Sequence, residues 1–334
     1  IGRFGDSARR VIDADGLIVA PGFIGGHTHL DAQVMWDPLG TCSCYHGVTS
    51  VVMSNCGFTL APCKPADRQW YASCLSYVED IPAAAMAAGM DWTWETFPEY
   101  MAAVERRPKG INYAMYVGHS ALRMYVMGRR ALTDAASDEE IRAMTQLIQQ
   151  ALRAGAVGVS TSLTHTHLTP EGTPVASRQA DWKEIEAIFA AMAELETGIF
   201  QFGQVLLSHT ANVTFLERLK QLALAYRRTV MFGLVGTRQG DDPVSWQTQA
   251  KVIKDVNEAG GRMFGQGTTR SINAIFSLKS YLPFDVLPEW QAVRSLPLDE
   301  QQRLLRDPAR RRELIAGEQR MKPKDNKLQG GGAA

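Results

Sequence analysis

Short runs of hydrophobic residues alternate with longer segments of helical periodicity along most of this 334-residue chain. The short runs are nearly continuous and rich in β-branched residues, which is typical of strands that a parallel sheet buries on both faces. Alternation of such strands with helices predicts an α/β protein. The seven predicted strands cover residues 17–24, 47–53, 111–117, 156–160, 198–202, 229–234 and 262–266.

Between the strands, apolar residues recur at the spacing of a helix with one buried face. Ser137 and Glu140 form the pattern of a capping box at the start of one such helix. Gly155 and Gly260 stand where a helix would end, each just before a predicted strand. The predicted helices cover residues 65–78, 94–106, 138–154, 181–195, 213–225 and 245–259, with further helices over 284–318.

This order of elements favours a TIM-like (β/α)8 barrel over residues 16–320, followed by a polar, Gly-rich tail at 321–334. Only seven strands are recognisable, so the barrel is expected to be incomplete. A doubly wound open sheet is the structural alternative. It would usually bring a Gly-rich phosphate loop after its first strand, and the sequence has none there.

The amino-acid composition argues against several classes of binding partner. Lys and Arg total 35, as do Asp and Glu, and no basic stripe is present, which argues against nucleic acid as a partner. No run approaches the ~18 apolar residues of a membrane span, so no membrane partner is expected. Five scattered cysteines do not form a disulfide framework and favour a reducing, cytoplasmic location.

Two histidines directly follow the first predicted strand, in the segment Pro21-Gly-Phe-Ile-Gly-Gly-His-Thr-His29. Their spacing of two puts both imidazoles on one face, with Thr28 on the other. Active sites of parallel barrels form at this end of the strands, and two imidazoles can share a metal ion. The alternative is a chance His-x-His on an exposed loop. The apolar strand immediately upstream favours His27 and His29 as metal ligands.

Cys56 follows the second predicted strand, within Ser54-Asn-Cys-Gly-Phe58. If the first two strands are neighbours, its thiol lies next to His27 and His29. A thiol beside a metal loses its proton and becomes a ligand that can bridge two ions. The alternative is a small buried hydrophobic residue. The remaining cysteines are predicted to be structural, although a metal site at the first two stays open: Cys42, Cys44, Cys63 and Cys74.

His119, Ser120 and Arg123 follow the third strand and form the predicted substrate-binding group. The planar guanidinium of Arg suits a carboxylate, since it donates two parallel hydrogen bonds. Satisfaction of these side chains by loop backbone is the alternative.

Four histidines remain. His209, after the fifth strand, is a tentative further metal ligand, with a solvated loop residue as the alternative. His165 and His167 are expected to be solvated, with a position in the pocket as the alternative. His46 precedes its strand and belongs to the other barrel face. No catalytic residue is identified.

A family resemblance lies in four segments, which are residues 11–39, 47–67, 81–98 and 112–127. It continues through Gly155-Ala-Val-Gly-Val-Ser-Thr161 and, more weakly, residues 260–264. These segments resemble the N-acyl-D-amino-acid deacylases, or D-aminoacylases, of the amidohydrolase superfamily. The resemblance implies a barrel that holds one or two zinc ions and hydrolyses the amide bond of an N-acyl-D-amino acid. A metal-activated water would attack the acyl carbonyl. A homo-oligomer is also possible.

The resemblance implies three metal ligands in this sequence. His27 and His29 match the family's ligands after the first strand, and Cys56 matches its cysteine ligand after the second. Gly25, however, stands where the family usually has Asp. Residues 233–238 lack the His expected after the sixth strand, and His209 matches the fifth-strand His poorly.

Larger parts of the family pattern are also missing. The eighth strand and its Asp, which binds metal and transfers protons, have no counterpart, and residues 1–15 resemble only the last piece of the flanking β-sandwich. The preferred interpretation is a fragment of a longer protein, and a second chain covering the gap is the other one. Two alternatives to a D-amino-acid deacylase remain: a non-catalytic or truncated barrel, and a related amidohydrolase that acts on a cyclic amide or lactone.

Overall fold

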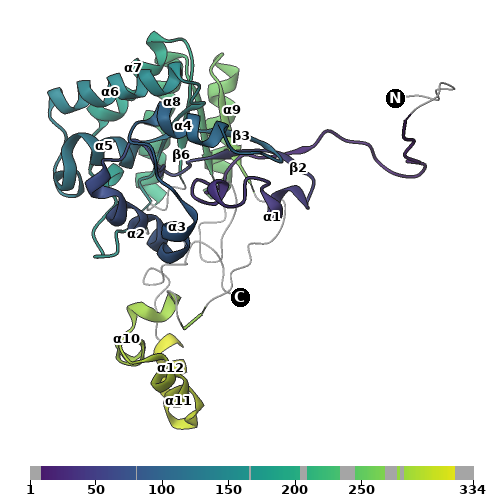
Figure 1. Cartoon of the computed structure of the whole chain (residues 1–334). Helices are drawn as coiled ribbons and strands as arrows, with labels where there is room; N and C mark the ends of the chain where they lie inside the picture. The colour runs from purple at the N-terminus through teal and green to yellow at the C-terminus, as the bar shows by residue number, and fades with distance from the viewer. Residues whose placement is uncertain are drawn as a thin grey trace.

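The structure is a computed structural model that describes residues 9–79, 81–164, 167–203, 209–233, 245–267, 277–278 and 282–319. Parallel strands form its centre, with helices packed around them (Figure 1). One sheet contains, in order, β1 (Phe23–Gly25), β2 (Val48–Met53) and β3 (Asn112–Met115). The other contains β4 (Val117–Gly118), β5 (Gly158–Thr161), β6 (Ile199–Phe202), β7 (Thr229–Gly233) and β8 (Met263–Gln266).

The two sheets share one extended segment, since β3 and β4 are separated only by Tyr116. The backbone N–H of Tyr116 donates to the carbonyl of Met53 (3.2 Å), and that of Val157 donates to the carbonyl of Met115 (2.9 Å). These bonds carry the sheet across the break. All pairings are parallel and follow the chain order, so the predicted α/β class and its seven strands are confirmed.

The first strand is shorter than predicted. Pairing begins at Phe23, whose N–H donates to the carbonyl of Gly47 (3.0 Å), and not at Leu17. The apolar side chains before it stay in solvent, and Ile18 is 94% exposed. Hydrophobicity alone predicted a strand here, but a strand also needs a neighbour that accepts its backbone hydrogen bonds.

Each of the six helices predicted between the strands is present. The side chain of Ser137 accepts from the N–H of Glu140, and the reciprocal bond completes the predicted capping box. Their bounds are α2 (Arg68–Glu79), α4 (Phe97–Glu105), α6 (Asp138–Arg153), α7 (Trp182–Glu194), α8 (His209–Tyr226) and α9 (Ser245–Glu258). Three helices were not predicted: α1 (Thr41–Cys44), α3 (Ala83–Gly89) and α5 (His119–Met127).

Aromatic side chains join the strands to the helices that cover them. Phe200 on β6 packs against Phe189 on α7, with ring centroids 4.7 Å apart. Phe202, on the same strand, packs against Phe215 on α8 at 4.6 Å. Burying each such ring contributes about 1.5–3 kcal/mol, so these contacts fix β6, whose Gln201 accepts from the backbone N–H of Cys56.

The C-terminal helices α10 (Pro288–Arg294), α11 (Leu298–Arg306) and α12 (Pro308–Gln319) form a group apart from the helices around the sheet (Figure 1). Within the described ranges, no helix has the length and apolar character needed to cross a membrane. Residues 1–8 and 320–334 lie outside the described part of the chain. The proposed division into residues 1–15, 16–320 and 321–334 therefore stays a prediction.

Candidate metal centre

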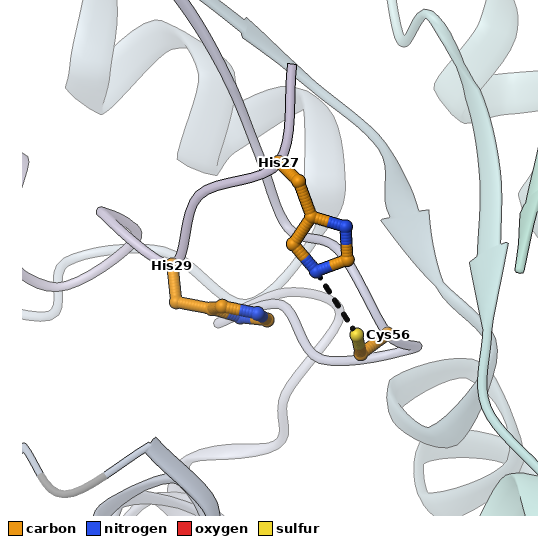
Figure 2. Close-up of side chains that lie close together, drawn as sticks. All are labelled: His27, His29 and Cys56. Carbon is orange, nitrogen blue, oxygen red and sulfur yellow. Dashed lines mark hydrogen bonds between the residues drawn. The ribbon is translucent and has the colours of Figure 1, made fainter. Parts of the chain in front are cut away.

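His27, His29 and Cys56 lie together at the carboxyl ends of β1 and β2 (Figure 2). One ligand atom from each residue lies within 4.8 Å of the others. The Sγ of Cys56 is 3.2 Å from the Nε2 of His27, and the two imidazole centroids are 5.4 Å apart. β1 and β2 are paired neighbours, so residues 27 and 56 leave the sheet side by side.

Cys56 occupies an unusual loop. Ser54 (φ 64°) and Cys56 (φ 56°) both adopt the left-handed backbone conformation, which costs non-glycine residues of order 1–3 kcal/mol. Other strands hold this loop in place: the N–H of Cys56 donates to the Oε1 of Gln201 on β6 (3.0 Å), and the N–H of Gly57 donates to the Oγ of Ser160 on β5 (3.0 Å). The thiol position is therefore set by three strands.

Asp31 ties the histidine segment to the same loop. Its carboxylate accepts from the backbone N–H of Ser54 (3.0 Å) and from the Ser54 hydroxyl. The hydroxyl of Tyr100 donates to the Asp31 carbonyl (2.8 Å). Burial raises the pKa of Asp31 to about 6, against the hydrogen bonds from Ser54. Asp31 thus connects the segment after β1 with the segment after β2.

His27 has a defined partner on each ring nitrogen. Its Nδ1 is 3.0 Å from the Oε1 of Gln266, the last residue of β8, and the Nε2 of Gln266 donates to the carbonyl of Gly26 (3.0 Å). An amide oxygen only accepts, so this network assigns the proton to His27 Nδ1. The His27 Nε2 then accepts from the thiol of Cys56.

Both imidazoles are suited to be neutral ligands. Burial lowers the pKa of His27, and it lowers that of His29 much further, where His27 and His167 add to the effect. Burial, with a contribution from Glu79, raises the pKa of the Cys56 thiol well above its usual value. Without a cation the site therefore holds two neutral rings and a protonated thiol, and a cation would favour the thiolate.

The donor set and its spacing fit a zinc ion. Two imidazole nitrogens and a thiol are ligands that zinc takes up in proteins, and tetrahedral zinc would separate the nitrogen and the sulfur by about 3.6 Å. The 3.2 Å between His27 Nε2 and Cys56 Sγ would need to widen by only a few tenths of an ångström. In addition, three buried polar atoms beside the site have no hydrogen-bond partner in the described structure: His29 Nδ1, Asn55 Oδ1 and Gln201 Nε2.

His167, predicted to be solvated, belongs to the surroundings of this site. Its Nδ1 is 2.8 Å from the Oγ of Ser162, its ring packs edge-on against Phe58 at 5.6 Å, and it lies close enough to His29 to lower that pKa. Gly203, at the end of β6, also borders the site. A Cβ at Gly203 would lie 3.3 Å from the Cys56 Sγ, so the glycine leaves room beside the thiol.

The predicted substrate-binding group lies beside the Cys56 loop, where the backbone N–H of Ser120 donates to the carbonyl of Gly57 (3.1 Å), but its side chains bond other protein groups. His119 begins α5 and is 1% exposed; its Nδ1 bonds Thr161 Oγ1 (2.9 Å) and its Nε2 bonds the carboxylate of Glu184 (2.6 Å). The other oxygen of Glu184 pairs with the fully buried Arg123. Ser120 bonds the hydroxyl of Ser177 (3.0 Å). These contacts occupy the side chains with protein partners, and the substrate-binding role stays a prediction.

Other predicted residues contribute less. His209 is the first residue of α8, but its side chain is outside the described part, so its role as a ligand stays a prediction. His165 lies outside the described residues altogether. The remaining cysteines are free thiols, with two near the surface and two buried: Cys42, Cys44, Cys63 and Cys74.

The sequence profile of the amidohydrolase family matches residues 10–306, which is most of the chain. The chain belongs to the amidohydrolase family. This confirms the resemblance found in the sequence, and several relatives of this amidohydrolase are deacylases. A D-aminoacylase from Alcaligenes xylosoxydans xylosoxydans is 39% identical over 162 residues, which cover 48% of this chain and 31% of the relative. An N-acyl-D-glutamate deacylase from the same organism is 35% identical over 254 residues, covering 75% of this chain and 46% of the relative.

Solved structures agree with these relatives. An N-acyl-D-glutamate deacylase from Bordetella bronchiseptica, complexed with zinc and a phosphonate mimic of the tetrahedral intermediate, superposes with a TM-score of 0.61 at 26% identity, over 80% of this amidohydrolase and 51% of that chain. A D-aminoacylase with a binuclear metal centre superposes with a TM-score of 0.59 at 27% identity, over 79% and 50%. This amidohydrolase therefore spans about half or less of the length of these relatives.

Proposed function

We propose that this amidohydrolase hydrolyses the amide bond of N-acyl-D-amino acids, with zinc held by His27, His29 and Cys56. The observation that carries the proposal is the meeting of these three side chains, with ligand atoms within 4.8 Å, at the carboxyl ends of adjacent parallel strands. In a parallel barrel, this end of the strands is where catalytic groups gather.

The relatives support both the chemistry and the substrate class. A D-aminoacylase, an N-acyl-D-aspartate deacylase and an N-acyl-D-glutamate deacylase all match this chain at 35–39% identity. Their names share the N-acyl-D-amino acid and differ in its side chain. A linear acyl amide is accordingly the proposed substrate.

Each ligand has a defined part in the proposed site. His27 and His29 would offer neutral nitrogen atoms, because burial lowers the pKa of both rings. Cys56 would give up its proton and coordinate as a thiolate. A bound ion would polarise the acyl carbonyl and lower the pKa of the attacking water toward ~7.

The attacking water also needs a base. Among the described residues, no carboxylate joins the three ligand atoms within 4.8 Å, and Glu79 and His167 border the cluster. His209 stays a proposed further ligand. His119, Ser120 and Arg123 stay a proposed substrate contact, which would need Arg123 to leave its buried pair with Glu184. A general base normally contributes about 10²–10⁴-fold to such reactions, so activity depends on which group fills this role.

Elemental analysis and turnover together test the proposal. Purified protein is analysed for zinc before and after chelation, and assayed with N-acetyl-D-amino acids, their L-enantiomers, and a cyclic amide of similar size. We expect about one or two zinc ions per chain and chelator-sensitive release of acetate from the D-substrates only. Folded protein without metal would refute the proposal and favour a non-catalytic barrel. Preference for the cyclic amide would favour the related amidohydrolase instead.

A further inference from the structure

The imidazoles of His27 and His29 each face a side chain that comes from a distant part of the fold. For His27 this is Gln266, whose Oε1 is 3.0 Å from Nδ1. Gln266 is also fixed by its own donation to the carbonyl of Gly26 (3.0 Å). Because the amide oxygen accepts, the ring holds its proton on Nδ1 and turns the Nε2 lone pair toward Cys56, 3.2 Å away.

The partner of His29 is a carboxylate on a helix. The Nδ1 of His29 is 3.4 Å from the Oε1 of Glu79, the last residue of α2. Both side chains are largely withdrawn from solvent, at 17% and 16% exposure. The two atoms are at ion-pair distance without hydrogen-bond alignment, since the buried Nδ1 makes no hydrogen bond in the described structure. A small rotation of the ring would align them.

Metal-binding histidines almost always donate their second ring N–H to a carboxylate, a carbonyl or water, which fixes the tautomer and the direction of the ring. We infer that Gln266 and Glu79 are the positioning residues of this centre, which hold His27 and His29 as Nδ1–H tautomers so that both rings present Nε2 to the ion. This inference rests on the proposed function, because it assigns roles around the same metal site.

The two partners differ in charge, and this gives them different effects. Glu79 is a carboxylate that strengthens the His29 donor and adds a negative charge near the cation. Gln266 is neutral and acts only by orienting the imidazole of His27. Gln266 also links β8 to the segment after β1 through its hydrogen bond to Gly26. The described structure contains no backbone pairing between β8 and β1. Through Gln266, the last described strand contributes to a site that is built on the first two.

Paired substitutions separate this role from a general structural one. Gln266→Met and Glu79→Leu remove the acceptor. Glu79→Gln keeps an acceptor oxygen without the charge, and Gln266→Glu keeps the acceptor oxygen but loses the donor to the Gly26 carbonyl. Gln69→Met, on the exposed face of α2, and Glu105→Leu, whose side chain is 83% exposed, are matched controls. Cobalt(II) affinity is measured by competition with a chelator, and the tautomer of each ring is read from 15N NMR spectra of the metal-free protein.

We expect Gln266→Met and Glu79→Leu each to weaken cobalt binding about 10–100-fold, the two oxygen-retaining variants to weaken it less than their acceptor-removing partners, and the controls to stay within about threefold of the original protein. In the NMR spectra, Gln266→Met should change the tautomer signature of His27 alone and Glu79→Leu that of His29 alone. Unchanged cobalt affinity in both acceptor-removing variants would overturn the inference, as would Nε2–H tautomers in the metal-free original protein.

The same measurements distinguish this inference from the proposed function. If the original protein binds no cobalt or zinc, the proposed function fails. The tautomers of the metal-free protein still decide whether Gln266 and Glu79 orient the rings. If the protein binds metal but the acceptor-removing variants bind it equally well, only the positioning roles fail.

Discussion

Two histidine–carboxylate pairs lie on opposite sides of the break between the two sheets, and their surroundings differ. His119 is buried and bonded on both nitrogens, to Thr161 and to Glu184 at 2.6 Å. His29 approaches Glu79 at 3.4 Å, and its Nδ1 makes no hydrogen bond in the described structure. Both ring nitrogens of His119 are thus bonded to other protein groups. The ring of His29 is still able to form a further bond.

We propose that this difference separates a stabilising network from the proposed metal site. Glu184 pairs with both His119 and Arg123, all of them buried, so removing one partner leaves an uncompensated charge in the interior. The residue His27 is exposed although its ring is desolvated enough to lower its pKa, His29 is partly exposed and Cys56 is buried, so the proposed site extends from the surface to the thiol. Histidines that look alike in the sequence therefore have opposite energetic roles.

The largest effect is expected for the metal ligands. The double variant His27→Ala, His29→Ala should lose zinc affinity by more than about 100-fold, because two of three described ligands disappear, with little change in the free energy of unfolding of the metal-free protein. His119→Ala should do the reverse, costing about 2–4 kcal/mol of stability and leaving the zinc content of folded protein unchanged. Elemental analysis and urea denaturation measure both. Zinc loss in folded His119→Ala would contradict the proposed division between the stabilising network and the metal site.

The next effect is the cost of breaking the buried ion pair. Glu184→Ala should reduce the free energy of unfolding by about 3–5 kcal/mol, because Arg123 is left charged without its carboxylate. The exposed pair of Lys183 and Asp138 is a control, and Asp138→Ala should leave the free energy of unfolding nearly unchanged because solvent screens this pair. Equal losses in the two variants, measured by urea denaturation, would remove the distinction between the buried network and the surface.

Acid should weaken the same network. Burial raises the pKa of Glu184, but the hydrogen bond and charge of His119 and the charge of Arg123 outweigh it, so the pKa lies below its usual value of 4.5. A carboxyl with a lowered pKa contributes its full stability above the unfolded value and loses it as the pH falls through the folded value. The stability difference between the original protein and Glu184→Gln should therefore shrink from pH 6 to about pH 3. A difference that grows on acidification would refute this assignment.

The smallest effect is expected at Gly203. A Cβ there would lie 3.3 Å from the Cys56 Sγ and 3.2 Å from the Ser162 Oγ, both slightly too close. Gly203→Ala should weaken zinc binding by only about two- to tenfold, because the thiol must shift by a few tenths of an ångström. Chelator competition measures this loss, and thermal unfolding of the metal-free variant controls for damage to the fold. Unchanged affinity would mean that the ion lies on the other side of the thiol.

The sequence predicted the fold better than the surroundings of the site. Seven strands and six helices were recognisable because their buried faces leave a periodic pattern in the chain. His27, His29 and Cys56 could be chosen because each directly follows a strand. Gln266 also ends a predicted strand and could have been noticed by the same rule. Glu79 carries no such signal, since it ends a helix and does not follow a strand.

The sequence by itself determined the order of the strands, the family and the residues at the strand ends, because these depend on local patterns and short spacings. Only the tertiary structure decided that His119 is saturated by Glu184 and that His29 is not. It also decided that Gln266 reaches His27 across 239 positions of the chain. Such partners follow from how helices and strands pack, and packing joins residues whose separation in the sequence carries no pattern.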